Sequence, residues 1–103
     1  MKSLSFNCRG LASAPKKLAL QRLFEVEQPE IILLQETLGS VEAISQSLHS
    51  LAPKWKFLAI DAIGRSGGLA LEYNPRNIRV DASWGGNGFL GMDIFSVELG
   101  QAL

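Results

Sequence analysis

The chain has little cysteine, little histidine and no excess of charge of either sign. Its only cysteine, Cys8, cannot form an internal disulfide, which is typical of a protein in a reducing compartment. The ten basic residues are matched by ten acidic residues, so the formal net charge is zero. Nucleic-acid-binding domains usually carry a basic excess, and any such binding here therefore requires a local basic cluster.

Long apolar runs are also missing. No uninterrupted apolar stretch approaches the roughly 20 residues that a membrane-spanning helix needs. The N-terminus lacks the apolar core of a secretory signal. We therefore expect an intracellular, soluble protein, nuclear or cytoplasmic, without a membrane partner. The length fits one domain covering residues 1–103, with no linker or internal repeat.

The first half of the sequence alternates predicted strands and helices. Lys2–Asn7 alternates apolar and polar residues, as a half-buried strand does. Ile31–Glu36 is a continuous apolar run ending in two polar residues, typical of a strand covered on both faces. Helices with apolar stripes are predicted over residues 15–28 and, capped by Ser40, over residues 41–52.

The second half consists of predicted strands only. These are Trp55–Ile60, Leu69–Tyr73, Ile78–Ala82 and Phe89–Leu99. A flexible loop over 64–68 and turns over 74–77 and 85–88 join them, and we expect the strand at 78–82 to pair back on the strand at 69–73. The order β-α-β-α-β-β-β-β predicts an α/β fold with a mixed sheet and helices on at least one face.

Polar residues close the first two predicted strands. Asn7 ends the first and Glu36 ends the second. Ligands collect at the carboxyl ends of strands in sheets built from βαβ units, and parallel neighbours would bring both residues to one edge. A carboxylate there can hold Mg²⁺, and an amide can donate to a phosphate oxygen or orient a neighbouring acid. Spacing alone favours a simpler interpretation, with Glu36 as a solvated strand end and Asn7 as a turn former.

Three short stretches of sequence favour the functional interpretation instead. They are SFNCRGL at 5–11, IILLQET at 31–37 and GRSGGLAL at 64–71. In this order and on this strand pattern, the sequence resembles the endonuclease/exonuclease/phosphatase superfamily from about Lys2 to about Glu98. It is most similar to the endonuclease domains of plant non-LTR (LINE-type) retrotransposons, which are relatives of apurinic/apyrimidinic endonucleases.

The resemblance implies a fold, a site and a reaction. The family fold is a four-layer α/β sandwich of two packed mixed β-sheets flanked by helices. Asn7 matches the family's active-site asparagine, and Glu36 matches the glutamate that binds the catalytic Mg²⁺ or Mn²⁺. The glycine pair Gly67–Gly68 matches a pair that is structural in the family. Arg9 stands where some repair-type relatives have an acid, and retrotransposon members often carry arginine there. The implied substrate of the full-length family is DNA.

Most of the family's later catalytic residues have no counterpart. The family supplies a tyrosine, an Asp-x-Asn pair, a further aspartate and a terminal Ser-Asp-His string, and no residue here is matched to any of these positions. We therefore expect the N-terminal half of the sandwich, an incomplete domain. Its expected function is that of a fragment of a Mg-dependent DNA endonuclease, inactive alone and binding its metal weakly. Tyr73 is expected to be an ordinary strand residue in a hairpin, and His49 a helix-surface or partly packed residue.

Other interpretations remain open. Arg9 and Arg65 are candidate phosphate contacts, although surface arginines are usually only solvated. Trp55 and Trp84 are expected to pack rather than to stack on bases. The chain can instead be a non-catalytic remnant or interaction module that self-associates through an apolar face left uncovered by a missing second sheet. A phosphatase or phosphodiesterase of the same superfamily, or a small complete α/β domain of another family, are further alternatives.

Overall fold

The computed structural model describes residues 2–11, 14–63, 66–86, 89–97 and 99–102, with the side chains of 61–63 and 66 left out. The chain forms two helices and seven strands within these ranges. They are β1 (Ser3–Asn7), α1 (Ala14–Glu27), β2 (Ile31–Gln35), α2 (Val41–Leu51), β3 (Lys56–Ile63), β4 (Ser66–Tyr73), β5 (Ile78–Gly86), β6 (Phe89–Ser96) and β7 (Gln101–Ala102).

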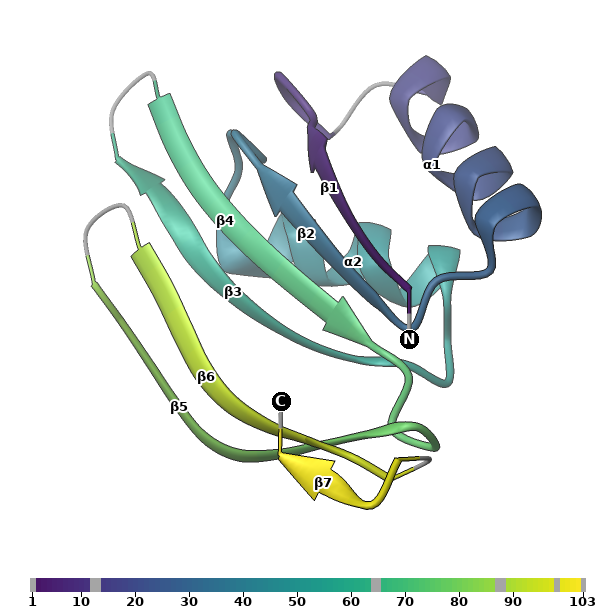
Figure 1. Cartoon of the computed structure of the whole chain (residues 1–103). Coiled ribbons are helices and arrows are strands. Elements are labelled where there is room, and N and C mark those ends of the chain that lie inside the picture. Colours follow the sequence, from purple (N-terminus) through teal and green to yellow (C-terminus); the bar gives the residue numbers. More distant parts are fainter. Residues whose placement is uncertain (1, 12–13, 64–65, 87–88, 98, 103) are drawn as a thin grey trace.

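The elements form three layers (Figure 1). The first sheet has the strand order β1-β2-β4-β3, with β1 and β2 parallel and the other neighbours antiparallel. The second sheet is antiparallel, in the order β5-β6-β7. Both helices pack on one face of the first sheet, and the second sheet covers its other face. The chain thus forms an α/β sandwich of three layers, which are the two helices, the mixed first sheet and the antiparallel second sheet.

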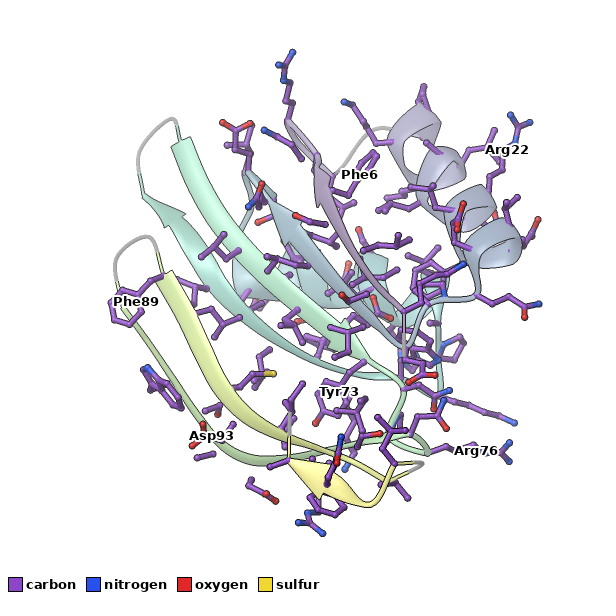
Figure 2. All side chains as sticks on the ribbon, in the orientation of Figure 1. Phe6, Arg22, Tyr73, Arg76, Phe89 and Asp93 are labelled. Atoms are coloured by element: carbon purple, nitrogen blue, oxygen red, sulfur yellow. The ribbon has the colours of Figure 1, made fainter. Side chains whose placement is uncertain are left out.

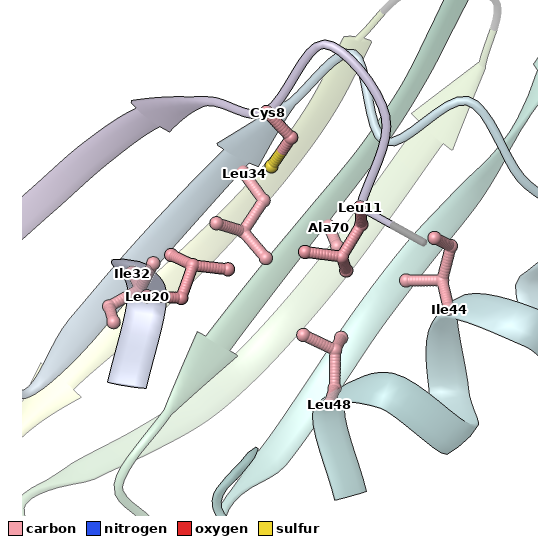
Figure 3. Packing of buried hydrophobic residues seen from close by; sticks show 8 residues of the cluster. All are labelled: Cys8, Leu11, Leu20, Ile32, Leu34, Ile44, Leu48 and Ala70. Carbon is pink, nitrogen blue, oxygen red and sulfur yellow. The ribbon is translucent and has the colours of Figure 1, made fainter. Parts of the chain in front are cut away.

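The larger core lies between the helices and the first sheet (Figure 3). Its position follows from the sequence pattern, because alternate residues of each strand face the helices and every third or fourth helix residue faces the sheet. Its buried members are Cys8, Leu11, Leu20, Ile32, Leu34, Ile44, Leu48 and Ala70. The second helix begins where predicted, since the Ser40 Oγ accepts a hydrogen bond from the Ala43 N–H at 3.2 Å.

A smaller core joins the two sheets. Its buried residues are Ile31, Tyr73 and Ile78, and Figure 2 shows Tyr73 between the sheets. At the far end of the same interface, a Cβ on Gly85 would lie 2.7 Å from Ile60 Cδ1. The Ile60 side chain therefore reaches Gly85 across the interface, and a side chain at position 85 would have to displace it.

The predicted hairpin between the strands at 69–73 and 78–82 is wrong. Those strands correspond to β4 and β5, and β5 pairs with β6 in the second sheet rather than with β4. The turn at 74–77 does form, with the Ile78 N–H donating to the Asn74 carbonyl at 3.0 Å. Ile78 is then buried between the sheets, and the strand that it begins belongs to the second sheet.

Several predicted boundaries also change. Gly67 and Gly68 lie inside β4 and not in a loop, and Gly85 and Gly86 lie inside β5 and not in a turn. The last predicted strand, 89–99, ends at Ser96, and the two-residue strand β7 follows. The apolar face that a missing second sheet would expose on the first sheet is covered by the second sheet. Neither described helix is both long and apolar enough to cross a bilayer.

Candidate functional site

The carboxyl ends of β1 and β2 lie together. The two strands are parallel neighbours, and their register pairs Asn7 with Gln35, so Glu36 follows directly at the same edge. The parallel order results from the α1 crossover between them, which returns the chain to the edge where β1 began. The sheet thus brings the two candidate residues Asn7 and Glu36 to one end.

Backbone hydrogen bonds hold the two segments that follow these strands against each other. The Gly10 N–H donates to the Glu36 carbonyl at 2.9 Å. The Leu11 N–H donates to the Thr37 carbonyl at 3.2 Å. The ladder between the strands thus continues past their last residues and fixes where the Glu36 backbone lies.

The glycine pair at the start of β4 supports the same segment from the other side. The Thr37 N–H donates to the Gly68 carbonyl at 3.2 Å, and the Leu38 N–H donates to the Gly67 carbonyl at 3.3 Å. Gly67 and Gly68 have φ angles of 87° and 84°, which side chains disfavour. The pair therefore has a structural role, in agreement with the prediction.

Three non-glycine residues at this edge have left-handed backbones. The φ angles are 48° at Arg9, 52° at Glu36 and 54° at Leu38. Such conformations cost on the order of 1–3 kcal/mol each and tend to cluster at functional sites. The backbone at this edge is therefore strained at Glu36 itself and at two neighbouring positions.

Asn7 is fixed by its own turn. Its Oδ1 accepts a hydrogen bond from the Arg9 N–H at 3.3 Å, and both side chains are exposed. Because the oxygen is engaged in this bond, the NH₂ group of Asn7 is the part that can donate to a ligand. Asn7 and Arg9 together offer donors suited to an anion.

Glu36 is the carboxylate available to a cation at this edge. Its side chain is half-buried. Among the described residues, no group of three or more His, Cys, Asp or Glu side chains lies close enough to hold a metal ion. Mg²⁺ commonly binds through one or two carboxylates and keeps several waters, so Glu36 fits as one ligand of a hydrated ion and not as part of a closed cage.

Solved structures share the fold of this chain. A humanized D. rerio TDP2 with 14 mutations matches with a TM-score of 0.71 and 17% identity, over 96% of this chain and 45% of that one. D. rerio TDP2 complexed with single strand DNA product matches with a TM-score of 0.71 and 19% identity, over 97% of this chain and 42% of that one. The endonuclease/exonuclease/phosphatase protein from Bacteroides vulgatus matches with a TM-score of 0.65 and 12% identity, over 97% of this chain and 48% of that one.

The fold is of the endonuclease/exonuclease/phosphatase type. The chain spans less than half the length of each of these solved proteins, and it therefore represents an incomplete sandwich of this type. No helix covers the outer face of the second sheet within the ranges that the structure describes. No model of a known protein family matches the chain, and no curated protein matches it either.

The other candidates of the sequence lie elsewhere in this endonuclease/exonuclease/phosphatase-type fold. Tyr73 pairs with Ile31, at the end of β2 opposite to Glu36. It lies between the sheets rather than in the predicted hairpin, and burial raises the pKa of its phenol. His49 is exposed on α2, as predicted. The candidate phosphate contact Arg65 lies outside the described residues.

The cysteine beside the site is not a nucleophile. Cys8 is fully buried, and this burial raises the pKa of its thiol to about 11 although the charge of Lys16 acts in the opposite direction. A thiol with this pKa is almost entirely protonated at neutral pH.

Thr37 is a feature that the sequence did not indicate. Its side chain is only 2% exposed, and its Oγ1 has no hydrogen-bond partner among the described residues. A buried hydroxyl without a partner costs roughly 1–3 kcal/mol, so it marks a position at which a water or ligand atom can bind. Nothing in the sequence distinguishes this threonine from one whose hydroxyl faces water.

Glycine at position 36 should stabilise the fold. We expect Glu36→Gly to raise the free energy of unfolding by about 1 kcal/mol, because glycine adopts the left-handed backbone without strain. Gln28→Gly is the matched control, since Gln28 has a φ angle of 46°, is exposed and follows α1. Urea denaturation of both variants measures the effect. Stabilisation by Gln28→Gly together with a loss of stability in Glu36→Gly would mean that the Glu36 side chain contributes to the fold itself.

Proposed function

We propose that residues 1–103 are a truncated domain, the N-terminal part of a Mg-dependent DNA endonuclease of plant retrotransposon type. In this proposal Glu36 is a ligand of Mg²⁺ or Mn²⁺, and Asn7 contacts the phosphate or orients the nucleophile. The supporting observation is the parallel pairing of β1 and β2, which brings both side chains to one sheet end while the Glu36 backbone is held in a strained conformation. The fold it shares with a protein complexed with single strand DNA product is consistent with a DNA substrate.

The chemistry explains what this half can contribute. Hydrolysis of a phosphodiester requires an activated water, stabilisation of charge on the phosphoryl oxygens and help for the leaving oxygen. A bound divalent ion supplies charge stabilisation and lowers the pKa of a bound water. The chain's own residues hold that ion through the Glu36 carboxylate and donate to the phosphate through the Asn7 NH₂ group. Arg9, and Arg65 by sequence, are proposed to contact neighbouring phosphates.

Alone, this half should be nearly inactive. No acid-base group accompanies Asn7 and Glu36 among the described residues of this edge, and the buried Glu72 pairs with Ile32, away from it. A positioned acid-base group commonly contributes about 10²–10⁴ in rate. A single carboxylate also binds Mg²⁺ weakly. The ancestral activity would therefore require the part of the fold that this chain does not span.

Two alternatives remain within the proposal. A phosphatase or phosphodiesterase acting on smaller esters would use the same metal and phosphate groups. A non-catalytic remnant would keep the fold and lose the metal. Metal binding at Glu36 distinguishes the non-catalytic remnant, which would not bind the ion, from the endonuclease and the phosphatase, which would.

The first experiment is nicking of supercoiled plasmid by the 103-residue chain, with Mg²⁺, with Mn²⁺ and with EDTA. We expect no metal-dependent nicking above the level of Glu36→Gln, because the acid-base residues are missing. Nicking that requires the metal and is lost in Glu36→Gln would contradict the predicted inactivity and show that these residues assemble a working site.

A second measurement tests the assignment of the metal ligand itself. Paramagnetic Mn²⁺ should selectively broaden the amide NMR signals of residues 7–10 and 36–38 in the wild-type chain. The same titration of Glu36→Gln should leave these signals sharp, and Glu42→Gln, on the exposed start of α2, is the control. Equal broadening in all three proteins, or broadening elsewhere, would refute the role of Glu36 whether or not plasmid is nicked.

A further inference from the structure

A pocket of about 130 Å³ lies between α1 and α2. Its apolar floor consists of Leu11, Leu20, Leu48 and Leu51. The first three are 1% exposed and belong to the core that Figure 3 shows. Helices form the outer layers of a four-layer α/β sandwich, and both walls of this pocket are described helices. The pocket is therefore not a surface that the second half of such a sandwich would cover.

The pocket forms because small side chains of α2 face α1. Residues four positions apart share one face of a helix, which places Lys17 with Gln21 on α1 and Ser47 with Leu51 on α2. All four residues line the pocket, together with Ser50. The two serine side chains are too short to fill the space between the helices.

The polar side chains of the pocket are free to bind a ligand. The Lys17 ammonium forms no ion pair or hydrogen bond within the part of the chain that the structure describes. The hydroxyls of Ser47 and Ser50 form no hydrogen bond within these ranges either, whereas the Ser45 hydroxyl donates to the Val41 carbonyl of its own helix. No described acidic residue lines the pocket.

This set of groups suits an anion. A free ammonium and two hydroxyls can all donate hydrogen bonds to a carboxylate. Lys17 lies in the first turn of α1, where the helix dipole favours a negative charge, and Leu51 lies in the last turn of α2, where the dipole disfavours one. We therefore expect the negative group of a ligand at Lys17 and its apolar part over the leucines.

The volume limits the apolar part to a small group. A dry cavity of about 150 Å³ lined by apolar side chains holds benzene. This pocket, at about 130 Å³, is of similar size and is also floored by leucines. The apolar part that fits is thus about one six-membered ring or an alkyl chain of similar volume.

We propose that this pocket binds a small monocarboxylate whose apolar part is a single ring or a short alkyl chain. The inference does not depend on the function proposed for Asn7 and Glu36. A rigid ring loses less conformational freedom on binding than a chain does, so benzoate is the probe of choice. We expect a dissociation constant in the millimolar range, because a ligand of about nine non-hydrogen atoms gains little binding free energy in total.

An NMR titration of the 103-residue chain with sodium benzoate, at constant ionic strength, tests the proposal. The amide signals of residues 17–21 and 47–51 should shift and saturate. Benzamide has nearly the same shape without the charge, and it should bind about two- to fivefold more weakly, the range expected for an exposed ion pair.

Three variants locate the site. Lys17→Gln should weaken the binding of benzoate to the level of benzamide and leave the binding of benzamide unchanged. Ser47→Leu should abolish saturable binding of both compounds, because the larger side chain fills the pocket. Arg76→Gln is the control, since it also removes one exposed positive charge, from the turn between β4 and β5. If Ser47→Leu does not fold, the exposed position of Lys17 still allows the comparison of charge.

The absence of saturable shifts in the wild-type chain would overturn the proposal. Equal affinities for benzoate and benzamide would overturn it too, because the pocket would then accept an apolar group without selecting its charge. Shifts centred on residues 7–10 and 36–38 would mean that the anion binds at the candidate site. That outcome would overturn this inference and leave the proposed function standing.

Discussion

Glu72→Met should raise the free energy of unfolding by several kcal/mol at pH 8, and this gain should shrink as the pH falls to 4.5. Glu72 is 1% exposed and is the second-to-last residue of β4. Its neighbours in the sheet are Ile32 and Phe57, which face the helical layer. Burial raises the pKa of the Glu72 carboxyl from 4.5 to about 8, and its Oε2 has no hydrogen-bond partner in the part of the chain that the structure describes.

The direction of the pH dependence follows from this raised pKa. Between pH 4.5 and about pH 8 the folded chain keeps the Glu72 proton while the unfolded chain loses it. Folding then becomes less favourable by about 1.4 kcal/mol for each unit of pH, or on the order of 5 kcal/mol over the whole interval. The stability is fully present below pH 4.5 and is lost as the pH rises to about 8. Methionine has no proton to lose and no unpaired oxygen to bury.

Urea denaturation at several pH values within this interval measures the effect. Glu72→Gln keeps the shape and removes the titration, so its stability should vary less with pH than that of the wild type. Glu25→Gln, at an exposed position of α1, should behave as the wild type does. A wild-type stability that is constant between pH 5 and pH 8 would show that the Glu72 carboxyl finds water or a cation in solution.

The sequence predicted the first half of the fold because its signals there are local. Alternation over 2–7, the apolar run after Pro29 and the cap at Ser40 each correspond to one element of the structure. A helix between two strands nearly always makes them parallel, and this rule also brought Asn7 and Glu36 to one edge.

The second half depends on contacts that no local pattern contains. Glycines usually indicate turns, but Gly68 lies inside a strand because a left-handed residue is needed there, and Gly85 because the Ile60 side chain reaches it across the interface between the sheets. The pairing of the strand after Asn77 is set by the burial of Ile78 between the sheets, since the same turn could equally close a hairpin. The sequence did not predict the burial of Glu72 either, because a polar residue in a strand usually faces water.

Some features of the candidate site were predictable from the sequence and others were not. The sequence indicated which residues to expect at the strand ends, and the resemblance gave them roles that stay proposals. It did not indicate the left-handed backbones of Arg9, Glu36 and Leu38 or the unpaired hydroxyl of Thr37. These features arise from hydrogen bonds between segments about 30 residues apart, such as that from Thr37 to Gly68.

Leu34→Ala should be among the most destabilising single changes in this chain, lowering the free energy of unfolding by about 3–5 kcal/mol. Leu34 is fully buried, and its neighbours in the core include Leu20 of α1 and Ala70 of β4 (Figure 3). The strands on both sides hold the backbone in place by hydrogen bonds, so the cavity cannot collapse fully. A domain of this size has a total stability of about 5–15 kcal/mol, and the loss removes a large part of it.

The position of Leu34 also connects the core to the site, because Glu36 follows it by two residues. We expect faster amide hydrogen exchange at residues 34–38 in the variant, since local opening of β2 becomes less costly. Leu18→Ala is the matched control, because Leu18 on α1 is 48% exposed and its truncation should cost well under 1 kcal/mol. Urea denaturation of the two variants compares the same chemical change inside and outside the core. Equal losses would mean that the helices do not pack on β2 in solution, and the presentation of Glu36 would then need another explanation.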